Sequence, residues 1–388
     1  MLINSTSNLY AKTRIPKYKA MPPNKGRCPT PTLCVMQTTC PFLAPSHMPK
    51  QKLTQLFCRL IKNSDICILF KYQPNKEHLL SVMRKVIGVG ETVLDIVFKH
   101  EQPIGALPGG SVFNTIVSLG RVGADATFIS AVGNDRVGTN VISFLKDNGV
   151  QADYVTKCDE GQTPISLAFL NERNDAEYLF YRDNKKNNPE FAYPDVQADD
   201  IVVFGSYYAV SPATRPQVVS FLEYAHNRGA IIYYDVNFRS GHRTDVMRIT
   251  PNLLENYEYA DVVRGSREDF EVLYRLSDPA KVYAAEVSFY CKRFVYTDGA
   301  NPVQLRADGV FCESYAVSDT QPVSTIGAGD NFNAGFIFGM LKLGVTRQRL
   351  IEGLTKEQWN KIMSYALAFS AESCKGTDNY VPKGWKPE

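Results

Sequence analysis

The chain has 388 residues, of which 44% are hydrophobic and 21% charged, a composition typical of a soluble enzyme with one large domain or two smaller ones. The formal net charge of +3 is divided unevenly, because residues 1–84 contain 13 Lys and Arg but two acidic residues, whereas residues 85–388 carry a net −8. The longest apolar run near the start, 66–70, is far shorter than the roughly 20 residues that span a bilayer, which excludes a membrane anchor there.

We interpret residues 1–84 as a basic extension that is either disordered or an over-extended reading frame with Met83 as the working start. An organellar transit peptide is the alternative, but the segment is rich in proline and shows no clear amphipathic helix. The chain has no CxxC pair, and four cysteines lie beyond this segment. We interpret those four as buried small hydrophobic side chains in a reducing compartment, and we expect a cytoplasmic protein. They are Cys158, Cys291, Cys312 and Cys374.

From Lys85 onward, short β-branched runs alternate with longer helix-like stretches. We predict strands over 85–90, 127–132, 201–204, 230–235 and 260–263. We predict helices over 110–123, 135–148, 212–228 and 267–276. This alternation is typical of a parallel sheet that helices cover on both faces.

Two stretches, 92–106 and 163–181, do not follow this alternation. Apolar and polar residues alternate within them, as at Ile165, Leu167 and Phe169, which predicts strands with one wet face. Such strands suit a small antiparallel sheet outside the main one.

The strongest chemical signal is the turn Gly327-Ala328-Gly329-Asp330, which opens an apolar helix. Small residues leave backbone N–H groups accessible at a helix N-terminus, where unpaired donors and the helix dipole favour phosphate. A carboxylate in the same turn can accept a proton from a hydroxyl. The alternative is a helix with glycine in its entry turn and Asp330 as a simple first-turn acid.

Two glycine-rich segments lie earlier in the chain. In Pro108–Asn114, two glycines before a helix would let a ligand approach the backbone, although the pair alone also fits a hairpin turn. In Gly88–Asp95, Val93 stands where a dinucleotide fingerprint requires glycine, so that interpretation is weak. Asp95 is either a solvated edge residue or a carboxylate that binds hydroxyls.

A third segment, 234–239, follows a strand of the buried type, at the position where open α/β sheets bind ligands. Asp235, Asn237 and Arg239 alternate toward one side. Arg239 could contact phosphate oxygens, or it could form a surface ion pair. The chain has no GxxxxGK[ST], HRD, DFG, HExxH or GxSxG motif, and its five histidines have no metal-ligand spacing.

Three features, in their order and spacing, resemble the ribokinase-like (PfkB) carbohydrate kinases. They are the glycine pair with Asn114, the segment 235–239 and the turn 327–330. The resemblance extends from about Lys85 to about Val381. The resemblance implies a three-layer α/β/α domain at 85–388 with a mainly parallel sheet and a small β-sheet lid. It further implies ATP and Mg²⁺ as cofactors, and a sugar and ATP as partners, with neither nucleic acid nor a membrane. A lid sheet with exposed edges favours a homodimer.

The resemblance also assigns roles to individual residues. Asp330 would be the general base, and the turn residues Gly327, Ala328 and Gly329 would form an anion hole. The sugar would contact Asp95, Gly109, Gly110, Asn114, Phe169 and Arg182. ATP would lie against Arg239, Asp269, Thr297, Gly299 and Ser373. Mg²⁺ would be held chiefly through water, with Asp269 or Glu268 as its candidate protein ligand.

The chain departs from the family pattern at two positions. Ser324 stands where many members have an aspartate that helps bind a monovalent cation, so potassium dependence is not expected. The segment 266–269 replaces an Asn-x-x-Glu pattern.

The resemblance thus implies an ATP-dependent kinase acting on a sugar hydroxyl. Its opening motif, 91–95, is similar to that of fructokinase-like and ketodeoxygluconate kinase-like members, and we expect a fructose-like substrate. A nucleoside kinase of the same fold is the first alternative, for which an aromatic slot at Phe169, Tyr178 and Phe180 would stack on a base. A sugar-binding sensor without turnover is the second.

Overall fold

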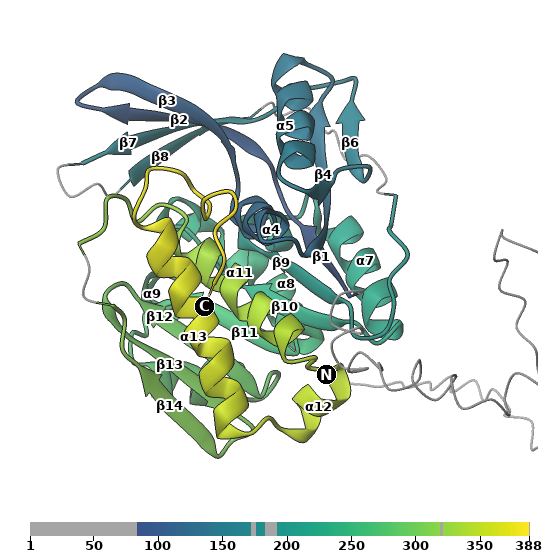
Figure 1. The fold of residues 1–388 in the computed structure, drawn as a ribbon, viewed down its shortest axis with the longest axis vertical. Helices are drawn as coiled ribbons and strands as arrows, with labels where there is room; N and C mark the ends of the chain where they lie inside the picture. The colour runs from purple at the N-terminus through teal and green to yellow at the C-terminus, as the bar shows by residue number, and fades with distance from the viewer. Residues whose placement is uncertain (1–83, 172–175, 183–191, 319–320, 388) are drawn as a thin grey trace, which may run out of the picture. The chain divides into compact units, whose positions relative to one another are not determined.

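The computed structural model describes residues 84–171, 176–182, 192–318 and 321–387, and a ten-stranded sheet forms its centre (Figure 1). The strand order is β14-β13-β12-β11-β10-β9-β1-β4-β5, with β6 paired to β4. Neighbours from β12 to β5 are parallel, whereas β13 and β14 are antiparallel. The bounds are β1 Lys85–Val89, β4 Asp125–Gly133, β5 Val150–Gln151, β6 Val155–Cys158, β9 Ile201–Gly205, β10 Ile231–Asp235, β11 Val262–Ser266, β12 Arg293–Asp298, β13 Asn301–Ala307 and β14 Phe311–Tyr315.

Helices cover both faces of this sheet, which confirms the predicted three-layer fold. One layer contains α4 Ser111–Arg121, α5 Arg136–Asp147, α11 Ala328–Lys342, α12 Arg347–Glu352 and α13 Lys356–Ser373. The other contains α6 Ser206–Val210, α7 Arg215–Asn227, α8 Val246–Tyr259, α9 Arg267–Tyr274 and α10 Pro279–Val282, with the short turns η1 Ser240–Asp245 and η2 Tyr283–Val287.

The central strands are apolar along their whole length because both of their faces are buried. In β10, Ile231 and Tyr233 pack in the core under α4, α11 and α13, whereas Ile232 and Tyr234 pack in the core under α7 and α8. Side chains of a strand alternate between the two faces, so one strand supplies both cores.

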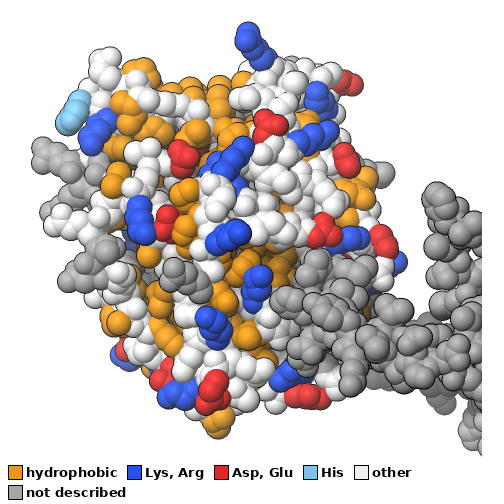
Figure 2. Space-filling view, in the orientation of Figure 1, with side chains coloured by type: hydrophobic (Ala, Val, Ile, Leu, Met, Phe, Trp, Pro, Cys, Tyr) orange, Lys and Arg blue, Asp and Glu red, His pale blue; other side chains and the backbone are white. Residues whose placement is uncertain are grey.

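A separate four-stranded sheet has the order β3-β2-β7-β8, and it contains both stretches that did not fit the βα alternation. Its strands are β2 Val93–Lys99, β3 Gln102–Gly109, β7 Ile165–Leu170 and β8 Ala176–Tyr181. Ile104, Leu179 and Tyr181 expose about half of their surface. Figure 2 shows hydrophobic side chains gathered at the top of the visible face, where Figure 1 places β2 and β3. The predicted homodimer through this sheet stays a prediction.

Several sequence expectations differ from the structure. The small sheet is mixed and not wholly antiparallel, because β2 and β7 pair in parallel. β11 continues to Ser266, beyond the predicted end at 263, because Arg264 is paired with a buried carboxylate and so is tolerated inside the sheet. Gly109 and Gly110 do not form a hairpin turn, since Gly109 ends β3 and Gly110 caps α4. Of the four cysteines beyond residue 84, all are free thiols, but Cys291 alone is buried and Cys312 is exposed.

The predicted extension, residues 1–84, lies outside the described residues except for Arg84. The Arg84 guanidinium donates to the carbonyl oxygens of Asp199 and Val345. Within the described residues, no helix is both long and apolar enough to cross a membrane.

Candidate active site

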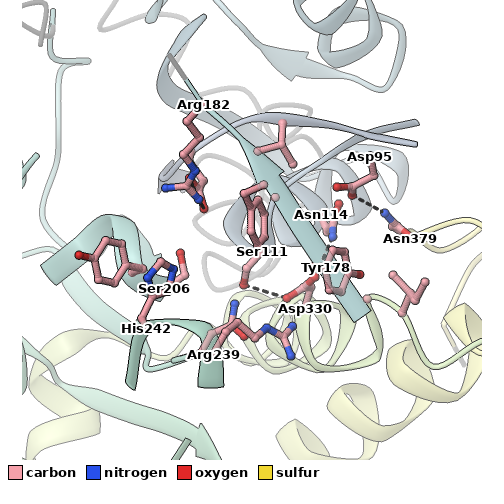
Figure 3. Close-up of a pocket in the computed structure, with 18 residues that line it drawn as sticks. Asp95, Ser111, Asn114, Tyr178, Arg182, Ser206, Arg239, His242, Asp330 and Asn379 are labelled. Carbon is pink, nitrogen blue, oxygen red and sulfur yellow. Dashed lines mark hydrogen bonds and ion pairs between the residues drawn. The ribbon is translucent and has the colours of Figure 1, made fainter. Parts of the chain in front are cut away.

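Two cavities with shared lining residues lie at the carboxyl ends of the parallel strands, and Figure 3 shows the first of them. The first lies between the small sheet, α4 and α11, and contains about 680 Å³ of empty space including its open mouth. The second is a groove of about 1760 Å³ along β11, β12, α11 and α13, and its size suits a nucleotide better. The residues that line both are Tyr178, Asn237, Arg239, Ile326, Gly327 and Asp330.

Asp330 lies at the junction of the two cavities, in the first turn of α11. Its Oδ1 accepts a hydrogen bond from the Ser111 hydroxyl (2.8 Å) and its Oδ2 one from the Asn114 amide (2.7 Å), which fix the carboxylate. Desolvation raises the pKa of Asp330 to about 6. The hydrogen bonds from Asn114 and Ser111 oppose this upward shift, whereas the charge of Asp235 adds to it. A half-buried carboxylate with this pKa is ionised at neutral pH and remains a competent proton acceptor.

The turn before α11 has the backbone geometry of an anion site. Gly327 has φ 76°, a conformation that favours glycine, and a Cβ there would come within 2.7 Å of the Asn379 carbonyl oxygen. The Ala328 N–H is not available, because it donates to the Thr325 carbonyl oxygen (3.2 Å). Within the described residues the N–H groups of Gly329 and Asp330 have no hydrogen-bond partner, so both remain available to a bound anion.

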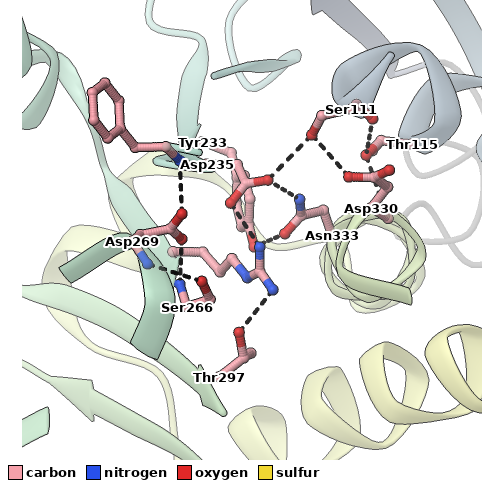
Figure 4. Close-up of polar contacts among 11 residues, drawn as sticks. Ser111, Thr115, Tyr233, Asp235, Ser266, Asp269, Thr297, Asp330 and Asn333 are labelled. Atoms are coloured by element: carbon pink, nitrogen blue, oxygen red, sulfur yellow. Dashed lines mark hydrogen bonds and ion pairs between the residues drawn. The ribbon is translucent and has the colours of Figure 1, made fainter. Parts of the chain in front are cut away.

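A buried ionic network lies beneath this turn (Figure 4). Asp235 accepts hydrogen bonds from the Arg264 guanidinium (2.9 Å) and from the Asn333 amide (2.8 Å). The other terminal nitrogen of Arg264 donates to the Thr297 hydroxyl (2.7 Å), which lines the groove. Desolvation lowers the pKa of Arg264, but the charges of Asp235 and Asp269 and the hydrogen bond to Asp235 together outweigh it, and the net shift is upward. The Arg264 guanidinium therefore links the buried Asp235 carboxylate to the wall of the groove.

Arg264 also explains a constraint on the turn. A Cβ added to Gly329 would lie 2.9 Å from an Arg264 terminal nitrogen, so a larger residue there would displace the guanidinium. The Nε of Arg264 is buried with no hydrogen-bond partner among the described residues.

Asp95 is buried at the other end of the first cavity, with 6% of its surface exposed, which contradicts the view of a solvated edge residue. It accepts hydrogen bonds from the Ser166 hydroxyl and from the Asn379 amide (3.4 Å). Desolvation raises the pKa of Asp95 to about 6; Ser166 opposes this shift, and the charges of Asp330 and Glu91 add to it. Within the part of the chain that the structure describes, the Oδ1 of Asn114 is buried without a hydrogen-bond partner, so this end offers acceptors for hydroxyl groups.

The structure brings most of the predicted site residues together. In the first cavity these are Asp95, Gly110, Asn114 and Arg182. In the groove they are Glu268, Thr297, Gly299, Ala328 and Gly329. Arg239, Gly327 and Asp330 line both.

Four predicted residues do not line either cavity. Gly109 instead makes room for the Asp95 carboxylate, because a Cβ at Gly109 would overlap it. Phe169 stacks on Phe98 with ring centroids 4.8 Å apart, and so belongs to the packing of the small sheet. Ser373 is buried, and its hydroxyl donates to the Ser370 carbonyl oxygen.

The fourth, Asp269, has a structural role. It forms a capping box with Ser266 and accepts a hydrogen bond from the Phe238 N–H (2.6 Å), so its oxygens are already used. Glu268 is exposed and lines the groove, which makes it the better placed of the two candidate metal ligands. Among the described residues, no cluster of three or more His, Cys, Asp or Glu could hold a metal by itself.

Sequence reasoning missed several residues that line or support the site. One of them, Ser206, follows β9 with φ 55°. Asn237, which the sequence had indicated as part of the segment 234–239, follows β10 with φ 34°. Non-glycine residues with such backbone angles cluster at functional sites, but sequence does not report them. Asn379 reaches Asp95 from 284 residues away, a contact for which the sequence carries no local signal. Arg264 and His242 were missed because nothing in the sequence showed which side chains face a cavity.

Comparisons with known proteins identify the family of this chain. A model of the pfkB family of carbohydrate kinases matches residues 83–378. A 5-dehydro-2-deoxygluconokinase of Geobacillus thermodenitrificans (strain NG80-2) is 28% identical over 247 residues, which cover 60% of this chain and 72% of the relative.

Solved structures show the same fold. A fructokinase double mutant from Vibrio cholerae O395, in a fructose-, ADP- and potassium-bound form, superimposes with a TM-score of 0.67 at 19% identity, covering 77% of this chain and 94% of that one. Adenosine kinase from Sinorhizobium meliloti gives 0.65 at 19% identity, covering 76% and 95%. The family match spans most of the described structure. This chain therefore belongs to the pfkB family of carbohydrate kinases, phosphotransferases that use ATP with a divalent metal and act on a hydroxyl acceptor.

Proposed function

We propose that this kinase binds a sugar in the first cavity and ATP in the groove, and that Asp330 accepts the proton of the attacking hydroxyl. The observation that supports this most directly is the position of Asp330, which lies where the two cavities join and carries two hydrogen bonds that orient it. A hydroxyl beside its carboxylate would face the groove, as an in-line transfer requires.

The residues of the turn and its surroundings would stabilise the transferred group. ATP bound in the groove supplies the phosphoryl group, and its divalent ion, which we expect to be Mg²⁺, neutralises phosphate charge. The unpaired N–H groups of Gly329 and Asp330 would donate to phosphoryl oxygens. Arg239 has no hydrogen bond or ion pair within the described part of the chain, and its guanidinium borders both cavities, so it is placed to contact the same oxygens.

The guanidinium of Arg239 is a permanent cation, since arginine keeps its proton at physiological pH. Desolvation lowers the pKa of Arg239, but Tyr178, Asp269 and Asp330 outweigh it and the net shift is upward. A permanent cation at the junction can offset the negative charge that approaches Asp330 when ATP binds. Ser324 is buried and its hydroxyl accepts a hydrogen bond from the Ile326 N–H, which is a local structural use, and we expect activity without added potassium.

The substrate of this kinase has two candidate classes, a sugar and a nucleoside. The curated relatives are named for 5-dehydro-2-deoxygluconate, whereas the fructokinase likeness rests on 19% identity and indicates the fold alone. The earlier preference for fructose therefore has no support beyond the opening motif. A nucleoside is the second candidate, since Tyr178 and Phe180 line the first cavity as nearly parallel rings with centroids 5.9 Å apart.

The test is a measurement of ADP release from Mg-ATP by the full chain with a panel of ketoses, aldoses, sugar acids, sugar phosphates and nucleosides. We expect turnover with at least one acceptor that carries several hydroxyls, and none without an acceptor. Turnover with nucleosides alone would replace the sugar kinase with the nucleoside kinase. A failure of every acceptor to raise ADP release, with ATP binding intact, would reject the proposed function.

A further inference from the structure

The segment 375–382, which follows α13 and which we name the C-terminal strap, is held against both α4 and the small sheet. Tyr380 is buried, and its hydroxyl donates to the carbonyl oxygen of Pro108 in β3. The Arg121 guanidinium, at the end of α4, donates to the Val381 carbonyl oxygen (2.7 Å) and lies over the Tyr380 ring. These contacts fix the course of the strap beside the first cavity.

Asn379 is the point at which the strap reaches the first cavity, and 4% of its surface is exposed. Its side-chain amide donates to the Oδ2 of Asp95 (3.4 Å), as Figure 3 shows. Its backbone carbonyl oxygen accepts a hydrogen bond from the Asn331 amide (2.9 Å), and Asn331 is the residue after Asp330 in the first turn of α11. One residue therefore contacts both a carboxylate of the sugar cavity and the helix turn that carries the base.

The side chain of Asn379 supplies a neutral donor in acidic surroundings. An ionised carboxylate only accepts hydrogen bonds, so the nitrogen of the carboxamide faces Asp95. Burial raises the pKa of Asp95 to about 6, and the hydrogen bonds from Ser166 and Asn379 act against this rise. The other titratable groups that interact with Asp95 are Asp330, Glu91, Tyr178 and Tyr380. Burial raises the pKa of both tyrosines, so they are neutral at physiological pH, whereas the two acids repel the ionised Asp95.

We propose that Asn379 is a positioning residue for the acceptor, because its amide orients the Asp95 carboxylate while its backbone connects that carboxylate to the turn of Asp330. The inference rests on the kinase function proposed above, in which the acceptor binds in the first cavity. A hydroxyl held by Asp95 is then kept in a fixed relation to the base, as in-line transfer requires. A substitution at Asn379 removes the side-chain contact but keeps the backbone one.

The first experiment measures steady-state kinetics of Asn379→Leu, which has a side chain of similar size but no donor. With the acceptor that gives the highest kcat/KM in the panel above, we expect its KM to rise about tenfold, and kcat and the KM of ATP to stay within a factor of about two. Asp378→Asn is the matched control, because Asp378 is an exposed strap residue that lines neither cavity and pairs with Arg121 only at 4.0 Å. A KM that rises equally in both variants, or in neither, overturns the proposal.

The second experiment is a double-mutant cycle, which separates positioning of Asp95 from a general structural role. It compares the wild type, Asn379→Leu, Asp95→Ala and the double variant, with denaturant titration of each as the folding control. If Asn379 acts through Asp95, Asn379→Leu should change the acceptor KM by less than about twofold once Asp95 is replaced. Effects that simply multiply would show that the two side chains act independently, and would reject the positioning role.

The third experiment measures the ionisation of Asp95 directly and needs no acceptor. Carboxyl ¹³C resonances of the full chain are followed from pH 4 to 8, and the Asp95 signal is identified by its loss in Asp95→Ala. Asn379→Leu should raise the pKa of Asp95 by at least about half a unit, because the lost hydrogen bond stabilises the ionised form. Asn379→Asp, which keeps the shape and adds a negative charge, should raise it further. An Asp95 titration that neither variant moves overturns the proposal.

The outcomes distinguish this inference from the kinase function. Turnover with an unchanged acceptor KM in Asn379→Leu would keep the kinase function and reject the role of Asn379. A shifted Asp95 titration, together with no turnover on any acceptor, would reject the kinase function and keep the contact through which Asn379 orients Asp95.

Discussion

The carboxyl edge of the ten-stranded sheet and the four-stranded sheet contribute to the same cavity in different ways. The large sheet presents Asp235 and Arg264 as a buried pair with nearly every polar atom in use. The small sheet presents Arg182 at its edge, where the side chain is about one third exposed. Buried, fully paired groups hold positions closely, whereas exposed ones adapt. We infer that the large sheet determines the chemistry and the small sheet the choice of substrate.

The largest effect should come from Asp330→Asn, which keeps the shape of the side chain but removes the base. We expect kcat to fall about 10² to 10⁴-fold, because a positioned base contributes that much. Steady-state kinetics with the best acceptor measures this, and unchanged ATP binding serves as the control. A rate within a factor of three of the wild type would show that Asp330 is not the base.

Next in size is the loss of the buried pair. Asp235→Asn leaves the Arg264 charge buried without its partner, so we expect the free energy of unfolding to fall by about 3–5 kcal/mol. Guanidinium titration of the full chain measures this. Lys375→Gln is the control, since Lys375 is an exposed partner of Glu372 and should change stability by less than about 0.5 kcal/mol. If Asp235→Asn lowered the free energy of unfolding as little as Lys375→Gln, the large sheet would be no more rigid at this point than the surface.

The pH profile gives a moderate effect with a definite sign. Burial raises the pKa values of Asp330 and Asp95 to about 6, so kcat/KM for a neutral acceptor should fall about tenfold per pH unit below that value. The free energy of unfolding should change with pH in the opposite direction to kcat/KM. The folded chain binds more protons than the unfolded chain between pH 4 and 6, so the free energy of unfolding decreases as the pH rises through that window. A flat rate profile down to pH 5 would contradict the raised pKa of Asp330.

The smallest effect should follow from changes on the exposed face of the small sheet. Leu179 is 47% exposed, so Leu179→Ser should change the free energy of unfolding by less than about 0.5 kcal/mol and leave ATP affinity unchanged. Denaturant titration and sedimentation velocity test this. A larger loss of stability that depends on protein concentration would show that a second copy of the chain covers this face.

The order of the elements could be predicted from the sequence because each βα unit carries a strong local pattern. β1 and α5 lie within about a residue of their expected ends, since Asp135 and Asn148 cap the helix by local hydrogen bonds. β11 was predicted too short because Arg264 reads as an exposed residue when its partner Asp235, 29 residues away, is not known. Local patterns report hydrophobic periodicity and caps, but not which charges will meet.

The sequence by itself determined that this chain is an α/β protein and that its turn at 327–330 stands at the start of a helix, because glycine spacing and apolar periodicity are local properties. The tertiary structure alone decided which residues share a cavity with Asp330. Ser111, Arg239 and Asn379 come from three distant segments, and their approach depends on how the strands and helices pack. Arg182 and His242 are brought to the same cavity in the same way, since packing sets contacts that no local pattern encodes.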